Sequence, residues 1–301
     1  MKTISIIIVS YNTFHFLPQC LNSIKEQTFR GKIKVVLIDT GNDGTEKLVK
    51  NKYPWVVYIP YPQNDGFGKA NNIGIKKYYD QTDYFLILNP DTKLAADNLE
   101  KMVNYLNKNP RVSVVSSKLI LPNGKLDRGC KRGFPTPWKS MGRFLFLDRV
   151  FPKTKLFGGY NLTYLDENGI HEVDSVKGAY MLVRKKAIDE IGMFDESFFM
   201  YGEDLDWCYR FKQKGWKIVY NSESHCIHYQ GVSSGIKKNS QEFTKASKET
   251  KLRAIRSFHE AMHIFYDKHY KERYNPLITK SVMITVNIKM EVALLLARIK
   301  S

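Results

Sequence analysis

Short apolar runs alternate with helical patterns through the first 117 residues of the chain. Runs rich in β-branched and aromatic residues predict strands, and segments with apolar residues at helical spacing predict helices between them. The predicted strands are Ile4–Ser10, Ile33–Ile38, Trp55–Ile59, Tyr84–Leu88 and Val112–Ser116, and the predicted helices are Phe16–Gln27, Lys69–Tyr79 and Leu99–Leu106. This alternation predicts a parallel sheet that is covered by helices, in an α/β fold.

The periodicity fades between Leu119 and His171, where Gly, Pro, aromatic and basic residues dominate. A loop-rich segment of this length inside a compact domain is usually functional or mobile. Regular patterning then returns, with predicted strands at Ala179–Arg184 and Ile218–Asn221 and predicted helices at Lys186–Ile191, Asp204–Lys214, Ser240–Tyr270 and Pro276–Ile299. We therefore predict one domain over residues 1–234, with halves 1–117 and 118–234, followed by a basic helical extension over residues 235–301.

The formal net charge of +17 comes almost entirely from two segments. Residues 118–160 hold ten Lys or Arg and two Asp or Glu, and residues 235–301 hold fourteen and six. Such surfaces attract nucleic acid, anionic lipid or phosphorylated substrates, and a basic surface that serves only solubility is the alternative. No run of 18 apolar residues occurs, so we predict no membrane span. The four cysteines have neither metal-like nor disulfide-like spacing, as in a cytosolic protein with reduced thiols.

Acidic residues mark two places in this basic chain. Five carboxylates lie between Asp195 and Asp206, and the neighbouring Phe198, Phe199, Tyr201 and Trp207 could supply apolar walls. Glu203 and Asp204 open the predicted helix there, where acids ordinarily stabilise the helix dipole. A carboxylate against apolar walls can also have its proton affinity tuned, so a general base that takes a proton from a hydroxyl is the functional alternative.

The second acidic place is the end of two predicted strands, because Asp39 and Asp91 each follow one. Ligands of open α/β sheets bind at the carboxyl ends of strands. Asp91 could cap a helix, or it could bind Mg²⁺ or Mn²⁺ together with substrate phosphates. His228 follows another strand and is either structural or a further metal ligand. The Gly/Asn loop over residues 63–74 opens a helix whose amides could hold a phosphate.

The ordered set of motifs resembles the inverting family 2 glycosyltransferases of GT-A fold, above all their rhamnosyltransferase-like branch. The resemblance covers residues 3–234 and rests on this series: Ser10-Tyr11-Asn12, Asp39, Asn64-x-Gly66-x-Gly68, Asn89-Pro90-Asp91, Gly178-Ala179, Glu203-Asp204-x-Asp206 and His228. It implies a Rossmann-like, mostly parallel sheet flanked by helices. It also implies that residues 1–117 form the nucleotide-sugar-binding half and residues 118–234 the acceptor-binding half.

The resemblance also implies roles for single residues. Those implied to bind the donor nucleotide are Ser10, Tyr11, Asn12, Asp39, Asn64, Gly66 and Asn71. Gly178 and Ala179 would lie against the donor sugar, and Asp91 and His228 would be ligands of Mg²⁺ or Mn²⁺. Asn89 replaces the first acid of the family's Asp-x-Asp motif and is placed with the donor-binding residues. Asp204 would be the catalytic base, with Glu203 beside it at the acceptor mouth.

We therefore expect an inverting, metal-dependent hexosyltransferase that uses a dTDP- or UDP-sugar, with dTDP-L-rhamnose as the first choice. The expected acceptor is a lipid-linked or surface-polysaccharide glycan, carried on a polyprenyl diphosphate. The basic segments predict a peripheral enzyme on the cytoplasmic face of the cell membrane, bound to anionic lipid rather than nucleic acid. Alternatives are a catalytically silent relative that binds sugar nucleotides and a polyanion-binding protein. The helix Pro276–Ile299 could lie on the membrane, pack on the domain or form a homodimer contact.

Overall fold

The structure is a computed structural model that describes residues 1–301 except 145–146, 152, 231–246 and 300–301. In its N-terminal half the long apolar runs form buried parallel strands, since strands covered on both faces read as continuous apolar sequence. The elements of this half are β1 (Thr3–Ser10), α1 (Leu17–Lys25), β2 (Lys32–Asp39), α2 (Thr45–Lys52), β3 (Val56–Pro60), α3 (Phe67–Lys77), β4 (Tyr84–Leu88), β5 (Thr92–Leu94) and α4 (Asn98–Lys108).

The second half adds strands of both directions to the same sheet. Its elements are β6 (Val112–Ile120), α5 (Pro137–Phe144), α6 (Leu147–Val150), β7 (Ile170–Val173), β8 (Tyr180–Arg184), α7 (Lys185–Ile191), α8 (Glu203–Gln213) and β9 (Lys217–His228). The strand order is β3-β2-β1-β4-β8-β6-β9-β5, with β7 pairing to β9. Only β5, β7 and β8 run against the other described strands, so the prediction of a mostly parallel sheet flanked by helices is confirmed.

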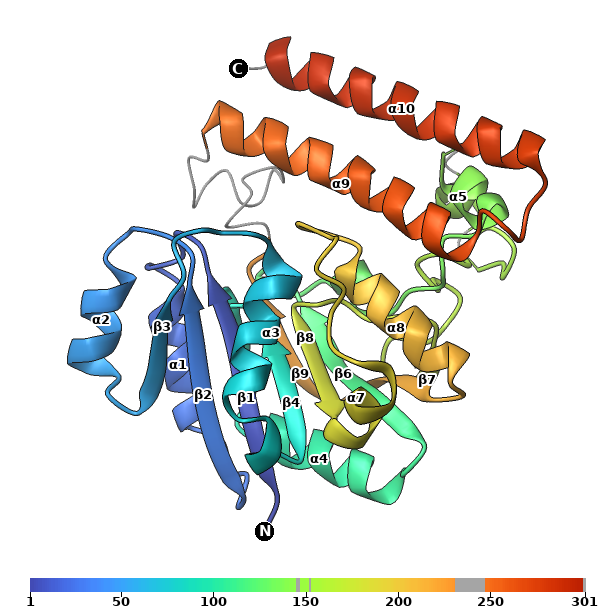
Figure 1. Cartoon of the computed structure of the whole chain (residues 1–301). Coiled ribbons are helices and arrows are strands. Elements are labelled where there is room, and N and C mark those ends of the chain that lie inside the picture. The colour runs from blue at the N-terminus through green and yellow to red at the C-terminus, as the bar shows by residue number, and fades with distance from the viewer. Residues whose placement is uncertain (145–146, 152, 231–246, 300–301) are drawn as a thin grey trace.

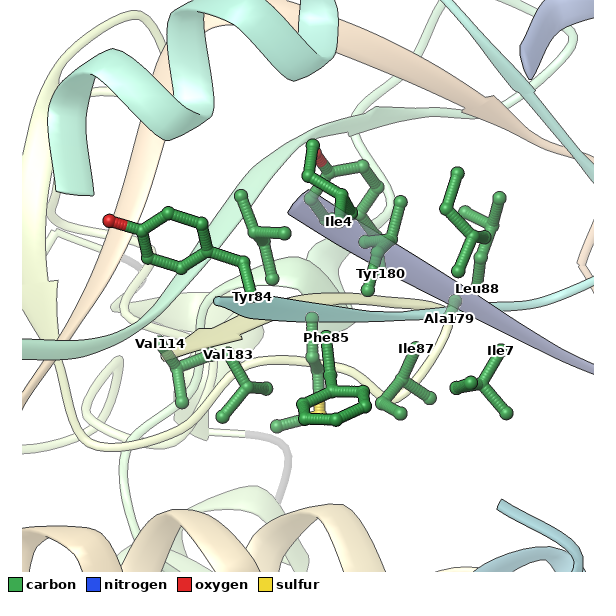
Figure 2. Close-up of a cluster of buried hydrophobic side chains, with 14 of the residues drawn as sticks. Ile4, Ile7, Tyr84, Phe85, Ile87, Leu88, Val114, Ala179, Tyr180 and Val183 are labelled. Carbon is green, nitrogen blue, oxygen red and sulfur yellow. The ribbon is translucent and has the colours of Figure 1, made fainter. Parts of the chain in front are cut away.

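The main core lies between this sheet and its covering helices. Figure 2 shows side chains of β1, β4, β6 and β8 packed on both faces of the sheet, among them the fully buried Phe85 and Tyr180. Burial of such apolar surface is the main source of folding free energy. All four cysteines are buried and free.

Most predicted elements occur within a few residues of their expected bounds, but five helices and strands were missed and two strands were predicted too short. The pattern gave no α2, β5, α5, α6 or β7, and it ended β6 at Ser116 rather than Ile120 and β9 at Asn221 rather than His228. The extra residues of β9 alternate between buried and exposed side chains, with several polar ones buried, so they lack the apolar run used to find strands. The residues 240–246 of the predicted helix Ser240–Tyr270 lie outside the described residues.

The C-terminal region is helical, as expected, and α9 (Lys248–His269) crosses the edge of the sheet where the parallel strands end (Figure 1). It packs on α8 through a second apolar cluster that includes Leu205, Tyr209 and Phe265. Helix α10 (Pro276–Ile299) lies beside α9, farther from the sheet (Figure 1). In α10 only Leu294 is buried, while Ile284, Ile288 and Leu295 are exposed.

A charged cluster joins α9 to α8 beside that apolar contact. Asp206 is fully buried in α8, and its Oδ1 accepts hydrogen bonds from His269 Nε2 at 2.8 Å and Lys268 Nζ at 2.7 Å. Arg210 Nε donates to Asp206 Oδ2 at 2.8 Å. The end of α9 is thereby fixed to the helix that begins with Glu203 and Asp204.

Candidate active site

The carboxyl ends of β1, β2 and β4 meet at one edge of the sheet. Ser10 is in register with Asp39, and Asn89-Pro90-Asp91 follows directly after β4. Asp39 is buried, and its carboxylate accepts hydrogen bonds from the Tyr58 hydroxyl at 2.8 Å and from Gly41 N at 3.1 Å. Burial raises the pKa of Asp39 despite these two donors. The two strand-end acids of the sequence thus lie at the same sheet edge.

The turn after β1 is built by its own polar side chains. Ser10 Oγ pairs with Thr13 Oγ1 at 2.8 Å inside the fold. Asn12 has a φ of 54°, and its Oδ1 accepts from Asn42 N at 3.2 Å. Ser10 and Asn12 therefore shape the turn, while Tyr11 between them lines the central cavity.

The Gly/Asn loop packs tightly on the loop that precedes α8. Gly66 has a φ of +116°, and a Cβ added to it would lie 2.5 Å from Phe199 O. Phe67 N donates to the same oxygen at 2.8 Å. Only glycine fits both the conformation and this close approach. Asn64 lines the cavity as well, whereas Asn71 is buried in α3 with Nδ2 donating to Phe67 O at 2.9 Å.

Asp91 and His228 are brought together by strand pairing. Thr92 in β5 is opposite His228 in β9, which leaves His228 Nε2 at 3.5 Å from Asp91 Oδ1. His228 Nδ1 donates to Asp127 Oδ2 at 2.8 Å, and Lys177 Nζ donates to the same oxygen at 2.6 Å. Burial alone would raise the pKa of Asp91, but His228 and Lys177 hold it below its ordinary value. Burial alone would lower the pKa of His228, but Asp91 and Asp127 raise it.

This pair has the character of part of a metal site. Asp91 Oδ1 is buried with no hydrogen-bond donor among the described residues. When the His228 ring is neutral and Nδ1 donates to Asp127, its Nε2 lone pair is left for a cation. A carboxylate that accepts from the other ring nitrogen is the usual partner of a metal-binding histidine. No group of three or more His, Cys, Asp or Glu suited to a metal occurs in the described part of the chain. The two donors fit a divalent cation whose other ligands come from phosphate oxygens or water.

The acid pair of α8 lies across from these groups, and its two carboxylates differ. Asp204 Oδ2 accepts from Arg132 Nη2 at 2.7 Å and from Gly178 N at 2.9 Å. Glu203 is buried, and its Oε2 has no hydrogen-bond partner within the described structure. Burial, together with the neighbouring Asp204, raises the pKa of Glu203 to about 8. The Glu203 carboxyl therefore keeps its proton to a higher pH than an ordinary glutamate does.

One cavity of about 1480 Å³ joins these groups. The predicted site residues that line it are Tyr11, Asn64, Gly66, Asn89, Asp91, Gly178, Ala179, Glu203, Asp204 and His228. The other predicted donor-binding residues, Ser10, Asn12, Asp39 and Asn71, are not among the residues that line it. Phe199 and Tyr201 supply apolar wall, as expected of the aromatic residues near the acid pair. Phe198 and Trp207 do not line the cavity. Phe198 packs in the second apolar cluster, and Trp207 packs on Phe194 in the main core and donates to Gly192 O.

Sequence reasoning missed several polar residues of the site and one of its walls. Asp127, Arg132 and Lys177 contact the predicted residues, but they come from segments without periodicity or a motif of their own. Charge in the segment 118–160 was noted, yet nothing in it distinguishes Arg132 from its basic neighbours. Residues of α9 and α10 form the far wall of the cavity, and the sequence predicted only that these segments are helical.

Comparison with known proteins agrees with this geometry. Residues 5–168 match the family described as Glycosyl transferase family 2, and residues 158–245 match Glycosyl transferase family group 2. The chain is 26% identical over 240 residues to an N-acetylglucosaminyl-diphospho-decaprenol L-rhamnosyltransferase of Mycobacterium tuberculosis, covering 76% of this chain and 77% of that protein. It is 28% identical over 233 residues to rhamnosyltransferase WbbL of Escherichia coli, covering 74% and 82%.

A solved structure supports the fold assignment. The mannosyltransferase PcManGT of Pyrobaculum calidifontis, in complex with GDP-Man and Mn²⁺, superposes with a TM-score of 0.56 at 16% identity, covering 98% of this chain and 72% of that one. At this identity the likeness establishes the GT-A fold alone. Among the described residues, no helix has both the length and the hydrophobicity needed to cross a bilayer.

Proposed function

Because the chain belongs to glycosyl transferase family 2, we propose that it transfers a sugar from a nucleoside-diphosphate sugar to an acceptor hydroxyl with inversion of the anomeric centre. The observation that carries this proposal is the single cavity that Asp91, His228 and Asp204 all line. Groups suited to the leaving diphosphate and a group suited to the attacking hydroxyl thereby share one reaction space. Such an arrangement supports a single displacement between two bound substrates.

We propose Asp91 and His228 as the protein ligands of Mg²⁺ or Mn²⁺. A cation bound there supplies Lewis-acid stabilisation of the charge on the leaving diphosphate. Asp127 keeps His228 in the required tautomer, and Lys177 adds a positive charge beside the same carboxylate. Gly178 and Ala179 offer a smooth wall for the donor sugar, and Asn64, Gly66 and Asn89 border the neighbouring space.

Asp204 is the proposed catalytic base. Its Oδ2 is fixed by Arg132 and Gly178, which orients the carboxylate and leaves Oδ1 without a hydrogen bond among the described residues. The acceptor hydroxyl would give its proton to Oδ1 as its oxygen attacks the anomeric carbon. Glu203 is less suited to this role, because burial and the neighbouring Asp204 raise its pKa and so favour its protonated form. It is instead suited to donating a hydrogen bond to the acceptor.

The names of the relatives support a choice of donor and acceptor to test. Both curated relatives described above are named rhamnosyltransferases, which supports dTDP-L-rhamnose as the first donor to test, with UDP-sugars next. The mycobacterial relative is named for a diphospho-decaprenol-linked acceptor, which supports a polyprenyl-diphosphate-linked glycan here. The exposed apolar residues of α10 and the basic extension 235–301 support a peripheral position on the cytoplasmic membrane face.

The first experiment measures binding and turnover of a panel of nucleotide-sugars, with Mn²⁺, Mg²⁺ or a chelator. The variant is Asp91→Asn, and the matched control is Asp80→Asn, an exposed acid of the same domain. We expect the wild type to turn over one donor in a metal-dependent reaction. Asp91→Asn should lose this activity, and Asp80→Asn should keep it. Binding of a nucleotide-sugar without turnover, with every acceptor supplied, would favour a catalytically silent relative. No binding of any nucleotide-sugar would overturn the proposal.

A further inference from the structure

The central cavity is larger than a nucleotide-sugar site requires. Its volume of about 1480 Å³ exceeds the roughly 300–1,000 Å³ that is usual for small-molecule pockets. Its lining also changes along its length. The end at the sheet edge carries Asp91, His228 and Asp204. The far end is walled by side chains of α9 and α10 that are mostly apolar or aromatic, with Glu249, Ser281, Thr285 and Lys289 among them. The cavity therefore has room and chemistry for a second, apolar ligand group.

The apolar end is built by one face of each tail helix. Ile278, Val282 and Val286 recur at helical spacing along α10, and Phe258 and Phe265 of α9 line the same cavity. Leu277 lines the cavity too and is 77% exposed, so this end reaches the molecular surface at the start of α10. Ile284, Ile288 and Leu295 continue from there along the outward face of α10. The apolar lining is thus continuous with an exposed apolar stripe.

Positive charge lies between the reacting groups and the apolar end. Arg253 of α9 lines the cavity, with its guanidinium 4.1 Å from the centre of the Phe199 ring. Phe199 belongs to the loop that leads into Glu203 and Asp204. A ligand with an anionic head near Arg253 would place its apolar chain between α9 and α10. A long-chain alkyl or isoprenoid diphosphate has this chemistry, and an apolar protein segment from a second copy does not.

We propose that the space between α9 and α10 binds the isoprenoid chain of a lipid-diphosphate-linked acceptor, with Arg253 at its diphosphate. This inference rests on the proposed function and extends it by giving the acceptor's lipid a defined place. The chain would leave the cavity beside Leu277, where this end of the cavity reaches the molecular surface. The tail helices would then determine which acceptors the enzyme uses, because a glycan without a lipid would lose these contacts.

The test measures binding of farnesyl diphosphate to the full chain by calorimetry, with inorganic pyrophosphate and farnesol as separate probes. Val286→Asp puts a charge on the cavity face of α10. Ile288→Asp is the matched control, since it makes the same kind of change two residues away on the exposed face. Thr285→Trp is a second variant that fills the cavity from an exposed position and does not depend on placing a charge.

We expect farnesyl diphosphate to bind at least tenfold more tightly than pyrophosphate to the wild type. Val286→Asp and Thr285→Trp should each weaken it about tenfold, and Ile288→Asp should leave it within twofold. Arg253→Gln should weaken both diphosphates but not farnesol. Equal binding of farnesyl diphosphate and pyrophosphate, or equal effects of Val286→Asp and Ile288→Asp, would overturn the inference. A dimer in light scattering that Val286→Asp dissociates would also overturn it, because a second copy would then occupy the groove.

These readouts separate the inference from the proposed function. Binding of farnesyl diphosphate is measured without donor, so it does not require that the enzyme transfer any sugar. Conversely, Val286→Asp could transfer sugar to a water-soluble acceptor with the kinetics of the wild type, while farnesyl diphosphate binds no more tightly than pyrophosphate. That result would support the transferase proposal and exclude the lipid subsite.

Discussion

Glu203 and Asp204 are neighbours in the chain, but their carboxylates have different surroundings. Asp204 is held by a guanidinium and a backbone amide, whereas Glu203 Oε2 is buried without a partner in the described structure. Asp204→Asn should therefore lower kcat by about 10²–10⁴ while donor binding stays within a fewfold, because only proton transfer is lost. Glu203→Gln, which keeps a hydrogen-bond donor, should keep far more activity. Single-turnover rates and donor titrations of the two variants check this, and the reverse ranking would assign the base to Glu203.

Glu203 also links stability to pH. Its pKa is raised to about 8 in the folded chain from an ordinary value of 4.5, so the folded state holds the proton more tightly than the unfolded state. The stability associated with that proton is complete below about pH 4.5 and is lost as the pH rises toward 8. Glu203→Gln should remove this loss and gain stability over the wild type by up to about 1 kcal/mol per pH unit across that window. Urea unfolding at pH 5, 6.5 and 8 measures it, and a pH-independent difference would contradict the prediction.

At the scale of elements, the contact between α8 and α9 depends on Asp206. Burial alone would raise the pKa of Asp206, but His269, Arg210 and Lys268 lower it to about 2. A depressed folded pKa stabilises the protein above the unfolded value of 3.8, and this contribution is lost as the pH falls from about 4 to about 2. Asp206→Asn should cost about 3 kcal/mol at neutral pH, because Arg210 and Lys268 lose their buried partner.

Denaturant unfolding of Asp206→Asn at pH 7 and at pH 3 provides the check. The difference in unfolding free energy between the variant and the wild type should be smaller at pH 3, because Asp206 begins to be protonated there in the wild type. Asp267→Asn is the control, since Asp267 is an exposed acid on α9 next to Lys268. If both variants lost the same stability, the anchoring of α9 through Asp206 would be wrong.

The elements also explain what the sequence could and could not predict. Strands β1, β2 and β4 were predictable because buried parallel strands give unbroken apolar runs, and their ends placed Asp39 and Asp91 at one edge. The hydrogen bond between His228 and Asp127 could not be predicted, since Asp127 is 101 residues away in a segment without periodicity. The Arg132–Asp204 pair joins residues 72 apart for the same reason. Contacts of this kind are set by tertiary packing and leave no local pattern.

At the scale of the whole molecule, the uneven charge and the tail helices act together. The outward face of α10 carries Ile288 at 59% and Leu295 at 56% exposure, seven residues apart and hence on one side of the helix. Exposed apolar stripes of this kind, with basic residues nearby, are typical of helices that lie in a membrane interface. Anionic lipid would add an electrostatic contribution that salt weakens.

The wild type should therefore co-sediment with vesicles of phosphatidylglycerol and phosphatidylcholine, and less so as salt rises or phosphatidylglycerol is removed. Ile288→Asp combined with Leu295→Asp should weaken this binding at least tenfold, because burying each apolar side chain contributes about 1.5–3 kcal/mol. Val286→Asp faces the cavity and should leave vesicle binding unchanged, the reverse of its expected effect on farnesyl diphosphate. The opposite result would be loss of vesicle binding in Val286→Asp but not in the Ile288→Asp, Leu295→Asp double variant. In that case α10 would contact the bilayer through its cavity face, and that face would bind the membrane rather than the chain of the acceptor.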